Sequence, residues 1–111
     1  MNDRELLEMA ARAAGMPRPV DDNGVWSSWV GTPENGHWWD PLTDDGDALR
    51  LAVKLHMTVD TFTGGCEVGY DDMKGGQGYL RQDDGPEGEL DDFEVVRRAI
   101  VRAAAEMGRV E

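Results

Sequence analysis

The chain has 111 residues, the size of one small domain with a modest core, and its 23 acidic against 11 basic residues give a formal charge of −12. This charge disfavours binding to nucleic acid or to an anionic membrane, and it permits binding to a basic protein surface. A lone cysteine excludes an intrachain disulfide, and the sequence shows neither a signal peptide nor a run of about 20 apolar residues. We therefore expect one soluble, intracellular domain over residues 1–111.

The first third of the chain predicts a helix followed by a hairpin. Asn2 is a capping residue for a helix over residues 3–14, and Gly15 is suited to end it. After a polar connector over residues 17–24, residues 25–30 have the composition of a strand. Asn35 and Gly36 form a turn, and residues 37–39 return as the second strand.

The centre of the chain predicts a short connection between this hairpin and a second helix. Pro41 ends the extended segment, and Thr43, Asp44 or Asp45 can cap a helix over residues 45–55. Apolar residues cover more than half of the circumference of this helix, so we expect burial on more than one side. They are Ala48, Leu49, Leu51, Ala52, Val53 and Leu55.

The last part of the chain predicts further antiparallel strands and a closing helix. Residues 57–62 alternate as a strand does, residues 66–70 follow a Gly-Gly turn as its partner, and residues 79–81 form a short third strand. Residues 82–92 form an acidic loop that we expect to be mobile. A helix follows over residues 92–108, with an apolar stripe of Phe93, Val96, Ile100, Ala103 and Met107.

The order of these elements is α-ββ-α-ββ(β)-α. Short connections and hairpin turns favour an antiparallel sheet with helices packed against it. We therefore predict an α+β fold, a single-domain α/β sandwich in which an antiparallel sheet packs with three helices.

Three segments resemble a known family. Residues 39–55 (WDPLTDDGDALRLAVKL) are similar to the central motif of small bacteriophage proteins called the phage ABA sandwich domain family. Residues 97–109 (RRAIVRAAAEMGR) resemble its closing helix, and residues 2–15 (NDRELLEMAARAAG) its first helix. The family often has Asn at the position of Asp40, and residues 16–38 and 56–92 match no pattern of it.

The resemblance implies a helix–sheet–helix sandwich, a phage or prophage origin and, with it, a place in the host cytoplasm. It implies no activity, because none is generally assigned to the family. Some small acidic phage proteins inhibit host defence systems, including CRISPR complexes, but that analogy is one of size, charge and origin.

The sequence offers no set of residues that carries catalysis or binds a metal or cofactor. Asp44, Asp45 and Asp47 fail the calcium-loop pattern, which requires a glutamate at its twelfth position, and helix capping explains them. His37, His56 and Cys66 lack a metal-binding spacing and a nucleophile–base arrangement. We therefore predict a protein that is not an enzyme, with no metal and no cofactor.

Exposed tryptophans and acidic residues are the candidates for a protein-binding site, because exposed tryptophan marks interfaces and carboxylates can dock on a basic groove. The candidates are Trp26, Trp29, Trp38, Asp71, Asp72, Asp83, Asp84, Glu87 and Glu89.

The favoured function is a non-enzymatic phage or prophage accessory protein that binds a host protein with a basic surface. An anti-defence inhibitor, acting on a defence complex such as a CRISPR effector, fits that description. A small-molecule or nucleotide-binding module (a signal sponge) and a structural phage protein are the alternatives, and a homodimer stays open. Direct binding of nucleic acid or membrane is not expected.

Overall fold

A computed structural model of the chain describes residues 2–16, 20–22, 25–27, 29–31, 34–72 and 75–109. The described elements follow the chain in the order α1 (Asp3–Ala13), β1 (Val20–Asp22), β2 (Val25–Ser27), β3 (Trp29–Gly31), β4 (Gly36–Trp38), α2 (Asp45–Lys54), β5 (Thr58–Phe62), β6 (Gly65–Asp71), β7 (Gln77–Asp83) and α3 (Asp92–Met107). The predicted α+β fold is confirmed: in the part of the chain that the structure describes, three helices and the three-stranded antiparallel sheet β5-β6-β7 form one globule.

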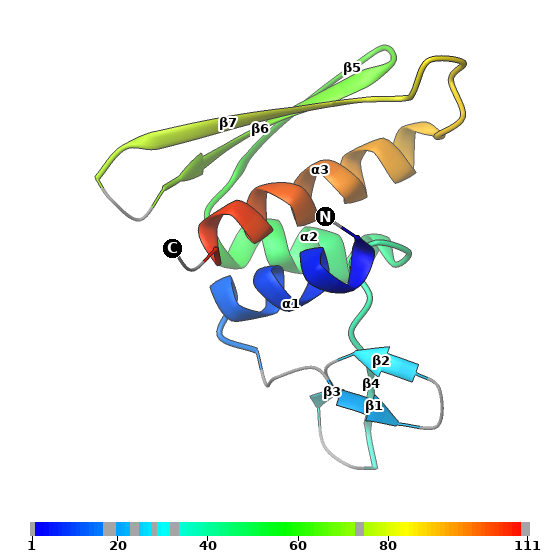
Figure 1. Cartoon of the computed structure of the whole chain (residues 1–111), viewed down its shortest axis with the longest axis vertical. Helices are drawn as coiled ribbons and strands as arrows, with labels where there is room; N and C mark the ends of the chain where they lie inside the picture. Colours follow the sequence, from blue (N-terminus) through cyan, green and yellow to red (C-terminus); the bar gives the residue numbers. More distant parts are fainter. Residues whose placement is uncertain are drawn as a thin grey trace.

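The elements lie in three layers, which Figure 1 shows from the side. The antiparallel sheet β5-β6-β7 is the upper layer, the three helices form the middle, and the small hairpins β1-β2 and β3-β4 lie below the helices. Among the described residues, no helix is both long and apolar enough to cross a lipid bilayer.

Helix α3 is the centre of the packing. It contacts α1 and α2 on one side and all three strands of the larger sheet on the other (Figure 1). Its buried residues are small or β-branched, so neighbouring backbones can approach closely. They are Val95, Ala99, Ile100, Val101, Ala103, Ala104 and Ala105.

Local signals explain where the helices begin. The Asn2 side chain accepts a hydrogen bond from the Glu5 backbone N–H at 2.9 Å, and Asp44 accepts one from Gly46 N–H at 3.1 Å. Asp91 and Glu94 form a reciprocal capping box at the start of α3. The predicted ends of all three helices agree with the structure to within one residue.

The N-terminal strands differ from the prediction. The expected single strand over residues 25–30 is two strands in different sheets: β2 pairs with β1, and β3 pairs with β4. The pairing of Trp29–Gly31 with Gly36–Trp38 is as predicted, whereas β1 lies in what we interpreted as a connector. The acidic residues Asp21 and Asp22 obscured β1, because acids are rare in strands.

The sheet β5-β6-β7 is longer than predicted. Strand β7 spans Gln77–Asp83 instead of residues 79–81, so Asp83 belongs to a strand and the acidic loop begins after it. Within that loop, Asp84 N–H donates to the Gly64 carbonyl and Leu90 N–H to the Asp84 carbonyl. The first bond ties the loop to the β5–β6 turn, and the second joins the two ends of the loop.

Three apolar residues expected in the core are exposed. Leu49 and Val53 of α2 are 63% and 65% exposed, and Phe93 of α3 is 66% exposed. Helix α2 buries one face only, which consists of Asp47, Ala48, Leu51 and Ala52. The expectation that α2 is buried on more than one side was therefore wrong, because the sheet packs on α3 and leaves the outer face of α2 uncovered.

Candidate functional site

The predicted binding residues whose side chains the structure describes do not form one site. Trp38 is half-buried in β4, on the hairpin side of the helices, whereas the predicted acids belong to the sheet layer and its loops (Figure 1). The strands β2 and β3 contain Trp26 and Trp29, whose side chains lie outside the described residues.

The predicted acids divide between the two ends of the sheet. Asp71 and Asp72 follow the end of β6, where Asp72 accepts a hydrogen bond from Gly76 N–H. Asp83, Asp84, Glu87 and Glu89 lie at the opposite end, since Asp83 pairs with Gly65 and Asp71 with Gln77. Seven residues of strand separate the two groups, which is about 20 Å.

One face of the sheet joins these ends. Because side chains alternate along a strand, Cys66 and Val68 point to α3 and are fully buried, while Glu67 and Gly69 point to the opposite, outer face. Among the described residues, no element packs on that outer face (Figure 1). We call it the acidic face. Its charged side chains are four acids and one arginine: Asp60, Glu67, Asp71, Asp83 and Arg81.

A like-charge pair lies at the centre of the acidic face. Asp60 of β5 is directly opposite Glu67 of β6 in the antiparallel register. Like charges in such positions destabilise a sheet. Arg81 of β7 is opposite Glu67 in the strand register. However, its guanidinium lies over the Phe62 ring, 4.7 Å from the ring centroid. The sequence contained this pair, but it becomes visible only once the register of the strands is known.

A hollow of ≈ 390 Å³ lies beside the pair. Its floor is Gly69, and Tyr79 lies against that glycine so closely that a Cβ atom there would be 3.3 Å from the tyrosine ring. Asp60, Glu67 and Asp71 line it. A cationic side chain fits this combination of carboxylates and an aromatic ring. An anion such as a phosphate is repelled.

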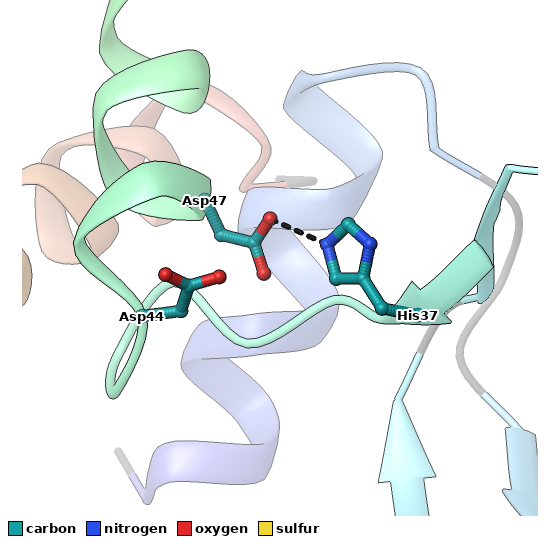
Figure 2. A group of neighbouring side chains, drawn as sticks. All are labelled: His37, Asp44 and Asp47. Carbon is teal, nitrogen blue, oxygen red and sulfur yellow. Dashed lines mark hydrogen bonds and ion pairs between the residues drawn. The ribbon is translucent and has the colours of Figure 1, made fainter. Parts of the chain in front are cut away.

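The second cluster of polar residues joins the hairpin β3-β4 to helix α2. Figure 2 shows His37 of β4 directed at Asp47 of α2, with Asp44 beside it. Asp47 is only 1% exposed, and its Oδ1 lies 2.9 Å from His37 Nε2 and 2.8 Å from Arg50 Nη2. Its Oδ2 accepts the Asp40 N–H at 2.9 Å. Burial alone would raise the pKa of Asp47, but the hydrogen bonds from Arg50, Asp40 N–H and His37 outweigh burial and lower it.

His37, Asp44 and Asp47 could hold a metal by distance, since one ligand atom from each lies within 4.8 Å of the others. However, Arg50 Nη2 already lies 2.8 Å from Asp47 Oδ1 and 4.0 Å from Asp44 Oδ2. A guanidinium therefore supplies the positive charge that a metal ion would bring. The cluster is suited to anchoring the hairpin, and the interpretation of Asp47 as a capping acid was wrong: Asp44 alone caps α2.

Cys66 and His56 do not approach a partner for catalysis among the described residues. Cys66 is fully buried under α3, and burial raises the pKa of its thiol. The interpretation of Cys66 as a buried core residue is confirmed.

No protein-family model matches this chain, and neither the curated proteins nor the solved structures contain a significant match to it.

Proposed function

We propose that the protein is a non-enzymatic binding protein that docks its acidic face on a basic surface of another protein. The Asp60–Glu67 pair supports this function best. It lies on an uncovered face, where its repulsion costs stability and a basic partner would relieve it. The formal charge of −12 adds long-range attraction to such a partner.

The biological role that we propose is that of a phage or prophage accessory protein in the host cytoplasm, acting as an anti-defence inhibitor of a host complex. The resemblance of residues 39–55 to the phage ABA sandwich domain family supports the origin. The acidic face supports the mode of action, because defence complexes that bind nucleic acid present basic grooves.

A pull-down from a bacterial lysate tests this function. The wild-type protein is compared with the double variant Asp60→Asn/Glu67→Gln and with Glu5→Gln/Glu34→Gln, which removes the same charge from exposed positions outside the acidic face. We expect a basic protein to be captured at low salt and released at about 1 M salt, where the Debye length is about 3 Å.

The variant Asp60→Asn/Glu67→Gln should capture less than about a tenth as much of this protein as the wild type does. The control variant Glu5→Gln/Glu34→Gln should capture about as much as the wild type. Equal capture by the two variants would contradict docking through the acidic face. Identification of the captured protein decides the role: a host defence complex supports the inhibitor, and a phage structural protein contradicts it.

A further inference from the structure

An apolar groove runs along the open edge of the sheet, between β5 and α2. A hollow of ≈ 340 Å³ there is lined mainly by apolar side chains from α2, β5 and α3. The apolar residues are Ala48, Leu49, Val59, Phe93, Val96 and Ile100. A second hollow of ≈ 330 Å³, lined by Thr61, Phe62, Phe93 and Val96 among others, continues it along β5. Leu49 and Phe93, which are largely exposed, thus lie on the walls of this groove.

The backbone of β5 is open to pairing. Strand β5 is at the edge of the sheet, and only β6 pairs with it among the described strands. The turn between β5 and β6 has two residues, so Phe62 and Gly65 close it as a hydrogen-bonded pair. Because hydrogen-bonded and non-bonded pairs alternate, the N–H and C=O groups of Val59 and Thr61 point away from β6, towards the groove side.

The opposite edge of the sheet is protected. Arg102 of α3 donates to the Arg81 carbonyl of β7 at 3.4 Å and to Gln82 Oε1 at 2.6 Å. A side chain from the central helix therefore occupies a backbone acceptor of β7 that a new strand would need. Among the described residues, no side chain is hydrogen-bonded to the corresponding groups of β5.

From these features we propose that an extended segment of the basic partner pairs with β5 as a fourth strand. This inference rests on the function proposed above and specifies the partner's chemistry. Side chains of an added strand alternate between the two faces of the sheet. Those on the α3 side enter the apolar groove, and those on the other side extend over the acidic face beside Asp60. The segment that fits is therefore one of alternating apolar and basic residues.

Charge selects this occupant over a second copy of the chain. Pairing of β5 with β5 of another copy about a central two-fold axis brings Asp60 against Asp60, next to Glu67 of each copy. Each copy also carries a formal charge of −12. A basic segment replaces both the local and the long-range repulsion with attraction, because its lysine or arginine side chains pair with the carboxylates.

Two synthetic peptides test the proposal with the intact protein. One alternates lysine and valine over about seven residues, enough to span β5, and the other contains the same residues in one lysine block and one valine block. Binding is followed by ¹⁵N NMR titration and by hydrogen exchange of the β5 amides. We expect the alternating peptide to bind at least about tenfold tighter and to slow exchange at Val59 and Thr61.

Two proline variants locate the binding site. Thr61→Pro removes an edge N–H that is not needed for pairing with β6. This variant should bind the alternating peptide only as weakly as the wild type binds the block peptide. Gln77→Pro, at the first position of β7 on the opposite edge of the sheet, is the matched control and should bind as the wild type does. Thermal unfolding and the ¹⁵N spectrum of each variant establish that the sheet is retained.

The outcomes separate the two proposals. Equal, salt-sensitive binding of both peptides overturns strand addition and leaves the acidic face as the docking surface. Wild-type binding by a folded Thr61→Pro variant also overturns strand addition. Failure of both peptides to bind overturns strand addition, whereas docking through the acidic face is decided separately by the pull-down with Asp60→Asn/Glu67→Gln.

Discussion

His37 in the middle of strand β4 and Asp47 in the first turn of helix α2 are joined through Nε2 and Oδ1 at 2.9 Å. This contact connects the small hairpin to the helical layer through a carboxylate that is buried and fully hydrogen-bonded. The half-exposed His37 closes one side of the carboxylate, and Arg50 closes another.

Substitution Asp47→Asn should destabilise the protein by about 2–4 kcal/mol, because it leaves buried donors with a poorer acceptor and removes the charge that Arg50 compensates. Asp45→Asn is the matched control: its carboxylate is exposed and pairs with Arg97, so its loss should cost less than about 1 kcal/mol. Urea unfolding of both variants measures the difference. Equal losses would contradict the anchoring role of Asp47.

Asp47 also predicts a dependence of stability on pH. Its pKa in the folded state is lower than in the unfolded chain, so its contribution is fully present above the unfolded value of about 4 and is lost as the pH falls through the folded pKa. The free energy of unfolding of the wild type should therefore fall more steeply below about pH 4 than that of Asp47→Asn. Parallel pH profiles would show that Asp47 does not carry this dependence.

Glu67→Gln should stabilise the folded protein slightly, by about 0.5 kcal/mol, because it relieves the repulsion with Asp60 across β5 and β6. The gain should shrink at high salt, which screens the repulsion in the wild type. Thermal unfolding at two salt concentrations checks this. The same variant in the pull-down above should bind less, so stability and binding should change in opposite directions.

Gly108→Ala should destabilise the protein by about 1–3 kcal/mol, since the added Cβ atom would collide with the backbone carbonyl of Met9 in α1. Gly46→Ala, in the first turn of α2, is the control, because the nearest atoms to its Cβ, at 3.0 Å, would be those of the Arg50 guanidinium, which needs to move only by a few tenths of an ångström beside Asp47. The midpoint temperature of thermal unfolding of this control should be unchanged or slightly raised. A neutral Gly108→Ala would mean that α1 and α3 can separate at low cost.

The Cys66 thiol should react with a disulfide reagent only when the protein unfolds. It is fully buried, and burial raises its pKa, so both access and the thiolate fraction are low. The measurement is the rate at which Cys66 releases the thiol of the reagent, in native buffer and in denaturant. Rapid reaction in native buffer would show that the β6–α3 contact opens frequently.

The parts of the fold that depend on neighbouring residues could be predicted from sequence. The helix boundaries follow from local caps such as Asn2 and Asp91, whose side chains bond to amides three residues away. The tight β5–β6 turn follows from Gly64, which has φ of +77°.

The parts that depend on distant residues could not be predicted. An amphipathic pattern says that Leu49 and Phe93 prefer burial, but which helix face the sheet covers depends on contacts across the whole chain. The opposition of Asp60 and Glu67 required the strand register. The burial of Asp47 required His37, which is ten residues earlier, to be placed by the hairpin. None of these three features could be recognised from the spacing of residues along the sequence.

The central position of α3 has a consequence for the order of folding. Helix α1 is synthesised first and α3 follows about 80 residues later, yet the two are in extensive contact, and the sheet also packs on α3. A nascent chain leaving the ribosome therefore has two incomplete halves, each with an uncovered apolar face, until residue 107 emerges. We expect the growing polypeptide to depend on chaperones or to remain largely unstructured, and then to fold cooperatively once α3 is available.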